Sequence, residues 1–266
     1  MSKITFLGTG HGFVFNLYNT CFVIENHNDY LLVDTGGSVE IVKRLKQHHI
    51  PLSSLHHIFI SHTHTDHIMG LFWIFKAMMG MMKNHQYEGQ LNIYCNKEVA
   101  RNIEVMMPCL LPIKGIELLK QYMIIHILED GMHKNIIDLD FEFFDVFARG
   151  NLLYGFETVI NHKKLIFLGD ETCHKDLYPR LKDAHYVMHE AFCLDKEEHI
   201  FHPYDKNHST VLSVCKEFKD LNISNLILFH SEDTHKDKKE LYLEEGYRIY
   251  NNHIIVPDEH EEIEVL

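Results

Sequence analysis

Residues 58–70 read IFISHTHTDHIMG. The opening IFIS has the apolar character of a short buried strand. Directly after it come three histidines and one aspartate within six positions: His62, His64, Asp66 and His67. Imidazoles and carboxylates are the usual ligands of divalent transition metals, and packing does not require so many of them together. A loop at the end of the strand can aim His62 and His64 at one cation and Asp66 and His67 at a neighbouring one.

Histidine is abundant in this chain, with 23 copies, so a metal site is not the default explanation for each of them. The pairs at 48–49 and 56–57 are expected at the solvated surface, and a lone His-x-His pair would be weak support for a metal. The complete His-x-His-x-Asp-His pattern after an apolar strand is different, and it favours a metal site over a coincidental cluster.

Composition sets the broad class of the protein. The 266 residues are 45% apolar and 24% charged, which is typical of a folded protein with one large core, and we expect one domain over residues 1–266. The formal net charge is -13. Such a surface repels phosphate backbones, so a small anionic substrate is favoured over nucleic acid.

The N-terminal sequence MSKITFLGTG lacks the charged-then-apolar pattern of a secretory signal, which predicts a cytoplasmic protein. Six cysteines without a CxxC pair predict reduced thiols. The most apolar run, residues 68–82, is interrupted by Gly70, Lys76 and Gly80 and falls short of the roughly 20 residues that cross a bilayer. No membrane partner is therefore expected.

The first half of the chain predicts alternating strands and helices. Strands are expected at 4–7, 21–24, 30–33 and 91–95, and helices at 39–48, 71–82 and 97–107, the last ended by Pro108. Residues 110–121 are broken by Pro112 and Gly115. Two alternatives stay open for them: a lid over the site, or a surface for a homodimer.

The second half repeats this pattern. The apolar run 165–168 leads into Gly-Asp-Glu-Thr at 169–172, as the run 31–33 leads into Asp34. The run 226–229 ends at His230, as the strand before His62 does. The repetition predicts an α/β fold with two similar half-sheets facing one another and helices outside them.

The metal-site motif and the residues upstream of it resemble those of a known family. SHTHTDHIMG, residues 61–70, is similar to the characteristic motif of the metallo-β-lactamase superfamily, and FLGTG with LLVDTGG upstream resembles its ribonuclease Z branch. The resemblance implies a four-layer αββα sandwich of two mixed β-sheets, with metal ligands from both halves at a shared edge. It also implies two divalent metal ions, zinc first, with iron or manganese as alternatives. Asp34 would support the ligands without being one.

The resemblance extends the ligand set into the second half. Asp170, in GDET, corresponds to the carboxylate that bridges both metals. His230, in LILFHS, corresponds to the late histidine that completes the second metal's shell with Asp66 and His67.

One histidine of the family pattern is absent. Six residues before the pair Gly155-Phe156, where the family has this ligand, the chain has Arg149. Arginine cannot coordinate a cation because it stays protonated and offers only donors. Four explanations stay open: a weakened first site, which His133 or a water could complete; a single-metal enzyme; a guanidinium that binds an anionic substrate group; or a shifted alignment of this loop.

Two further segments resemble the ribonuclease Z branch. His-Glu-Ala-Phe at 189–192 is similar to its HEAT segment, and Asn-His-Ser-Thr at 207–210 to its HST motif at the start of a helix. The resemblance implies a catalytic role for His208, as the acid that protonates the leaving oxygen, and for Glu190, which would hold the charge of that imidazole.

Together these residues predict a metal-dependent hydrolase, first of all a phosphodiesterase in which Asp66 positions a metal-bound hydroxide. Three alternatives remain: a ribonuclease Z-type tRNA 3′-processing endonuclease, a lactonase or thioesterase with Arg149 binding a carboxylate, and a metal- or ligand-binding module without turnover. The tRNA alternative is disfavoured by the acidic charge. It is also disfavoured because residues 155–168 form only one hairpin where tRNA-processing relatives carry a long arm.

Overall fold

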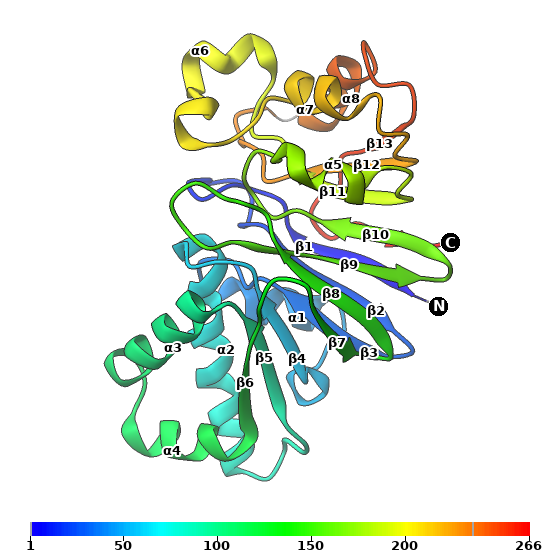
Figure 1. Ribbon diagram of the computed structural model, residues 1–266. Coiled ribbons are helices and arrows are strands. Elements are labelled where there is room, and N and C mark those ends of the chain that lie inside the picture. Colours follow the sequence, from blue (N-terminus) through cyan, green and yellow to red (C-terminus); the bar gives the residue numbers. More distant parts are fainter. Residues whose placement is uncertain (1, 236) are drawn as a thin grey trace.

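The structure is a computed structural model that describes residues 2–235 and 237–266, and in it two β-sheets stack face to face with helices outside each of them (Figure 1). Within these residues the first sheet has seven strands, in the spatial order β14 (Glu262–Glu264), β1 (Lys3–Gly8), β2 (Cys21–Asn26), β3 (Asp29–Val33), β4 (His57–Ile60), β5 (Leu91–Cys95) and β6 (Met123–Ile127). Across the same residues the second sheet also has seven, in the order β13 (His253–Ile255), β12 (Asn225–Phe229), β11 (Tyr186–Glu190), β10 (Lys163–Phe167), β9 (Tyr154–Ile160), β8 (Leu139–Asp145) and β7 (Met132–Ile136).

Helices form the two outer layers. Those on the first sheet are α1 (Glu40–Gln47), α2 (Thr65–Lys83), α3 (Lys97–Leu110) and α4 (Ile113–Tyr122), with the short 3-10 helix η1 (Leu52–Ser54). Those on the side of the second sheet are α5 (Tyr178–Leu181), α6 (Glu198–Phe201), α7 (Val211–Phe218) and α8 (Lys238–Gly246), with η2 (Lys175–Leu177), η3 (Asp195–Glu197) and η4 (Pro203–Lys206).

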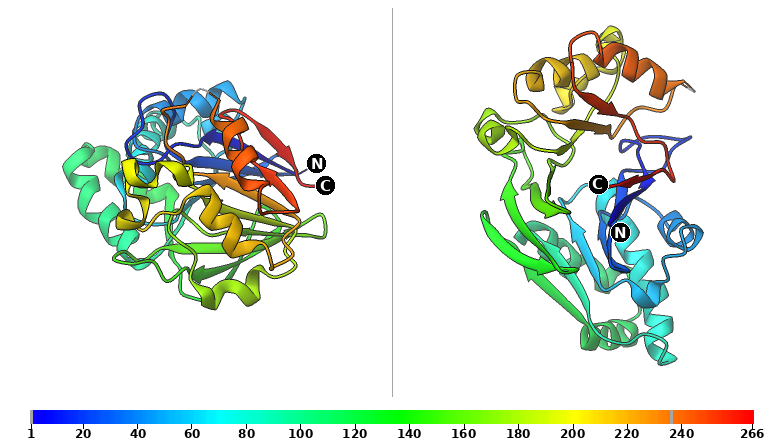
Figure 2. Two further views of the ribbon diagram at one scale, coloured as in Figure 1. Left: turned by 90° about the horizontal axis from the view of Figure 1, so that it is seen from above. Right: turned by 90° about the vertical axis from the view of Figure 1, so that its right-hand side faces the viewer.

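Both sheets are mixed. In the first, β14, β1, β2 and β3 pair antiparallel, and β3 to β6 pair parallel. In the second, β7 to β10 pair antiparallel and β10 to β13 pair parallel. The expected αββα sandwich is confirmed, and the pairing of β14 with β1 brings the two termini side by side (Figure 2).

Phenylalanine fills the space between the sheets. The ring of Phe59 on β4 lies 5.1 Å from Phe143 and 5.7 Å from Phe156 on the opposite sheet, and Phe22 lies 5.3 Å from Phe167. Edge-to-face and tilted pairs at these distances are favourable beyond the apolar area they bury. This rigid core fixes the strand ends from which the polar residues emerge.

Two local predictions were wrong, and a third segment, 110–121, stayed open between a lid and a dimer surface. Helix α2 begins at Thr65 and not at residue 71, so Asp66 and His67 lie in its first turn and not in a loop. Pro108 does not end α3, because in the last turn of the helix it displaces few intrahelical bonds. Most of the segment 110–121 is helix α4, which packs on α2.

Two further observations concern the described residues as a group. No helix among them has the length and apolar character to cross a membrane. The six cysteines are free thiols, as predicted.

Candidate metal centre

Four strands deliver the polar residues to one edge of the sandwich. His62 and His64 follow β4, while Asp170 follows β10 of the opposite sheet. His230 is the first residue after β12, and Asp34 the first after β3. Asp34 and His230 both have a left-handed backbone, with φ of 55° and 58°. Such strained conformations in non-glycine residues concentrate at functional sites.

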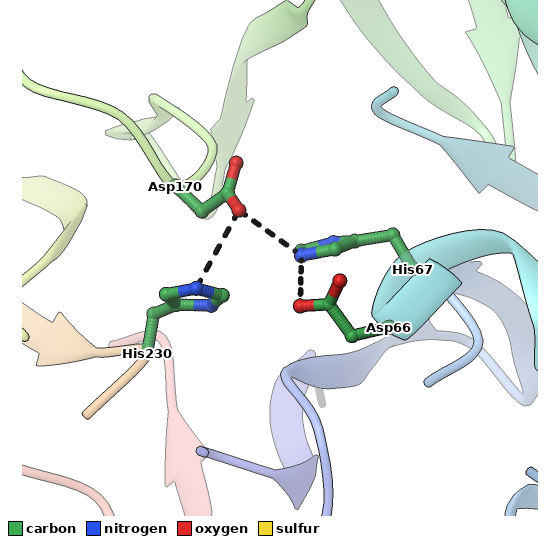
Figure 3. A group of neighbouring side chains, drawn as sticks. All are labelled: Asp66, His67, Asp170 and His230. Atoms are coloured by element: carbon green, nitrogen blue, oxygen red, sulfur yellow. Dashed lines mark ion pairs between the residues drawn. The ribbon is translucent and has the colours of Figure 1, made fainter. Parts of the chain in front are cut away.

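Asp66, His67, Asp170 and His230 form one ligand group, with one ligand atom from each residue within 4.8 Å of the others (Figure 3). His67 Nε2 lies 3.2 Å from Asp66 Oδ2 and 3.2 Å from Asp170 Oδ2. His230 Nε2 lies 3.5 Å from the same Asp170 oxygen. All four side chains are buried.

His62, His64 and Asp170 form the second such group. His62 Nε2 lies 3.5 Å from Asp170 Oδ1, and the His62 and His64 rings are 4.4 Å apart. The two oxygens of Asp170 therefore face different groups, which is the geometry of a bridging carboxylate. In the remainder of the text the His62 group is the first site and the His67 group the second site.

Each buried imidazole is oriented through its other nitrogen. His67 Nδ1 donates to Asp34 Oδ2 at 2.8 Å. His62 Nδ1 lies 3.0 Å from the Ser61 hydroxyl, which itself donates to Asp34. Because a ring nitrogen that donates in this way carries the proton, the Nε2 atoms are left with free lone pairs for a metal.

Thr20 does the same for His230. Its hydroxyl donates to the Gly10 carbonyl and lies 3.1 Å from His230 Nδ1, so the hydroxyl oxygen accepts from the imidazole. The β1–β2 loop that carries Thr20 is itself fixed to the second sheet, because Ser231 N donates to Thr9 O and His11 N to Ser231 O.

The donor atoms fit a metal. Among the described residues, buried side-chain atoms without a hydrogen-bond partner include His62 Nε2, His67 Nε2 and Asp170 Oδ1. Leaving such atoms unpaired is costly, and coordination of a divalent cation would satisfy them. Imidazole with carboxylate suits zinc, iron and manganese alike.

The charges favour a cation in the same place. Burial alone would lower the pKa of His67, yet Asp66 and two further carboxylates raise it well above its ordinary value. Burial would raise the pKa of Asp66 and of Asp170, but the neighbouring imidazoles hold both below their ordinary values. Burial lowers the pKa of His62 to about 4 and that of His230 well below its usual range. The site thus combines ionised carboxylates with two neutral imidazoles, His62 and His230, and its carboxylates draw positive charge to the centre, where without a metal His67 holds a proton.

Asn151, and not Arg149, lies against the first site. The Asn151 amide nitrogen is 2.6 Å from His64 Nε2. Arg149 is exposed, and its backbone N–H donates to Glu171 at 2.8 Å. His133 lies on β7, where it contacts Asp140 at 2.9 Å. Asn151 is therefore the residue of this loop that contacts a ligand of the first site.

His208 and Glu190 lie beside the second site. The His208 ring is 5.2 Å from that of His230, and its Nδ1 is 3.7 Å from Glu190 Oε2. Glu190 Oε1 accepts from the Ser209 backbone at 2.6 Å. His208 lies two residues before Thr210, the N-cap of helix α7, so the motif at 207–210 stands at the start of a helix as expected.

Thr20 and Asn151 could not be identified from the sequence, because neither belongs to a local motif. Thr20 is 210 positions from His230, and Asn151 is 87 from His64. Ser61 lies directly before His62 within residues 58–70. Of the three residues that were missed, it is the one that the local sequence motif could have indicated.

Comparison with known proteins places these residues in a family. The family model described as Anti-Pycsar protein Apyc1 matches residues 2–248. The Anti-Pycsar protein Apyc1 of Bacillus phage 010DV004 is 46% identical over 70 residues, so this alignment spans about a quarter of each protein, 26% of both. The Ribonuclease Z of Lactobacillus helveticus (strain DPC 4571) is 26% identical, with 96% of each chain covered.

Solved structures share the fold at lower identity. The metallo-β-lactamase fold protein YhfI from Bacillus subtilis superimposes with a TM-score of 0.81, at 16% identity and with 98% of each chain covered. Human tRNase Z, short form, gives a TM-score of 0.74 at 18% identity, with 99% of each chain covered. The resemblance to the metallo-β-lactamase superfamily and its ribonuclease Z branch is thereby confirmed. The chain belongs to the Anti-Pycsar protein Apyc1 family and has the metallo-β-lactamase fold.

Proposed function

We propose that this chain is a metal-dependent phosphodiesterase of small phosphodiesters, and that it shares the anti-Pycsar role for which its phage relatives are named. One observation carries the proposal: Asp170 is shared by two ligand groups, and the pair of His208 and Glu190 lies beside them.

Each residue has a distinct task. His62, His64 and Asp170 would hold one cation, with Asn151 beside them, and the second site would hold another. When bound, such cations lower the pKa of water and polarise a phosphoryl oxygen. The Asp66 carboxylate would orient the attacking water by accepting a hydrogen bond from it, since the Asp66 side chain is the more accessible of the two carboxylates.

His208 donates a proton to the departing oxygen, and Glu190 restores it. Burial raises the pKa of Glu190 well above its ordinary value and lowers the pKa of His208. Before the reaction the proton of this pair therefore resides on Glu190, while neutral His208 can donate from Nε2. As the Nε2 proton leaves, Nδ1 becomes basic and takes the Glu190 proton across 3.7 Å, a gap that must shorten to hydrogen-bond range.

A small substrate fits the surroundings of the site. Between Asn151 and Asp170 the chain makes only the β9–β10 hairpin, which turns at Asn161 and His162. The net charge of -13 disfavours a long phosphate backbone. Exposed Arg149, beside Glu171, is the cation that we propose binds the anionic end of the substrate.

The decisive assay is hydrolysis of bis-p-nitrophenyl phosphate with metal analysis of the same samples. His208→Ala is expected to lower turnover by about 10²–10⁴-fold and leave the metal content unchanged, because His208 acts on a proton and not on a cation. His199→Ala, an exposed histidine on α6, is the matched control and should behave as wild type.

Other outcomes would contradict the proposal. If His208→Ala lost metal in proportion to activity, His208 would be structural. If the protein with its metal sites filled hydrolysed no phosphodiester but did hydrolyse a lactone or thioester, the lactonase or thioesterase alternative would replace the phosphodiesterase proposal. If the metal sites were filled and the protein hydrolysed no ester of any kind, it would be a metal- or ligand-binding module without turnover.

A second candidate is tRNA 3′ processing, which is favoured by the Ribonuclease Z relative at 26% identity. It predicts cleavage of a precursor tRNA at a single 3′ position, at a rate per enzyme well above that on bis-p-nitrophenyl phosphate. A homodimer formed through residues 110–121 also stays a proposal, to be tested by light scattering.

A further inference from the structure

A cluster outside the proposed active site brings together Glu197, Glu232 and His235, with one ligand atom from each within 4.8 Å of the others. Glu197 ends η3, and Glu232 follows β12 by three residues. His235 lies in the segment between β12 and α8. Three separate segments of the second half therefore converge on one point.

The two carboxylates are almost completely buried, with 7% exposure for Glu197 and 1% for Glu232. The His235 ring contacts one oxygen of Glu197, and Thr234 donates to one oxygen of Glu232 through both its backbone and its hydroxyl. The other oxygens, Glu197 Oε2 and Glu232 Oε1, are buried without a hydrogen-bond partner among the described residues.

A protonated His235 cannot account for this arrangement alone. It would offset one of two buried negative charges and would leave both free oxygens unpaired. Burying carboxylate oxygens without a donor or a cation is costly, and such groups are normally paired or bound to a metal. The Lys238 ammonium group attracts Glu232, but it donates to the Ser231 hydroxyl at 2.7 Å and leaves Glu232 Oε1 without a hydrogen bond.

We propose that Glu197, Glu232 and His235 bind a divalent transition-metal ion, of the zinc or manganese class, at a site separate from the two of the active centre. Two carboxylates and one imidazole are ligands that both ions accept. His235 also lines a cavity of about 490 Å³, together with acidic Asp233 and Asp258, which gives a cation a route from solvent.

A cation at this site would stabilise the backbone that positions the residues of the proposed active centre. Glu232 lies two residues after His230, and its backbone N–H donates to the Phe192 carbonyl at 2.8 Å. The Phe192 ring stacks on His208 at 5.1 Å. A cation that joins Glu232 to Glu197 on η3 and to His235 would therefore restrain the backbone next to His230 and next to Phe192, which packs on His208.

The test is the metal stoichiometry of the full-length protein after equilibration with Zn²⁺ or Mn²⁺ and removal of free ions. Glu197→Gln and His235→Ala should each bind one equivalent fewer than wild type. Neighbouring Glu198→Gln and His199→Ala are matched controls and should bind as many ions as wild type. Circular dichroism establishes that each variant is folded.

Anomalous scattering at the metal edge then locates the ions. A peak between Glu197, Glu232 and His235 in wild type, absent from crystals of His235→Ala, is the expected result. Unchanged stoichiometry in both variants, or loss of the equivalent from the Asp170 centre with no peak at this cluster, would overturn the proposal. Because the readout is ion number and position, it is independent of whether the phosphodiesterase proposal holds.

Discussion

Gly70 and Gly80 lie in the same helix, α2, but differ in what an added methyl group would meet. At Gly70 an added Cβ would overlap the Thr35 carbonyl oxygen and lie 2.8 Å from its carbon and 3.0 Å from the Gly36 oxygen. At Gly80 no atom of the described residues lies within 4 Å. Gly70→Ala is therefore predicted to destabilise the protein, and Gly80→Ala to stabilise it.

The magnitude follows from the contacts that hold α2 against the turn after β3. Non-bonded carbon atoms rest about 3.5–4.0 Å apart, so the helix would have to withdraw by on the order of 1 Å. That movement strains two buried bonds, from Gly70 N to Gly36 O at 2.8 Å and from Thr35 N to His67 O at 2.9 Å. Overpacking costs about 1–3 kcal/mol and a lost buried bond a similar amount, against about 1 kcal/mol gained in helix propensity, so the net loss is about 1–5 kcal/mol.

Urea unfolding followed by far-UV circular dichroism measures both variants against wild type. Gly80→Ala should gain about 0.5–1 kcal/mol, because alanine loses less backbone entropy and meets no neighbour. Gly70→Ala should also bind metal more weakly, since the turn that it displaces follows Asp34. A Gly70→Ala protein as stable as Gly80→Ala would refute the packing that we describe between α2 and this turn.

Three further predictions concern the site and the surface. Asp34→Asn should lower metal affinity by about 10–100-fold in a chelator competition, because it weakens the group that orients two imidazoles; unchanged affinity would show that Asp34 has no such role. Asn151→His should raise the zinc affinity of the first site and Asn151→Leu lower it, as measured by calorimetry, and equal affinities would place Asn151 outside the site. A hydrogen bond from Arg180 lowers the pKa of Glu142 below 4.5 in the folded protein. This interaction therefore stabilises the protein above pH 4.5, and the stabilisation is lost as the pH falls through the pKa that Glu142 has in the folded state. The stability deficit of Arg180→Met should therefore shrink between about pH 6 and about pH 3 in urea unfolding, and a constant deficit would contradict the linkage.

The sequence predicted those parts of the fold that depend on local pattern. Strands β4, β10 and β12 are short apolar runs, and each is followed within three residues by a ligand: His62, Asp170 or His230. Because these strands lie in mixed sheets with parallel pairs, their carboxyl ends reach one edge, and a ligand at each end is sufficient to predict a shared site.

Strands whose stability depends on their neighbours were not predicted. Strand β7, with the sequence MHKNI, lies at a sheet edge and is mostly polar, so its pairing with β8 comes from the partner strand and not from its own residues. Strand β11 is fully buried yet ends in His189 and Glu190, two residue types that rarely occupy a buried strand. The sequence identified these residues as a motif and could not show that they continue a strand.

The two sites of the centre differ in how firmly their ligands are held. In the second site all four residues are buried, and both imidazoles are oriented through Nδ1, by Asp34 and by Thr20. In the first site His64 is exposed, and it is held by Asn151 from the loop that precedes β9. Since a pre-organised ligand set loses less conformational entropy when it binds, we expect the second site to bind its cation more tightly than the first. The absence of the expected third histidine therefore concerns the site that lies closer to solvent, and Asp170, which belongs to both ligand groups, would link that site to the one that is fixed by the core.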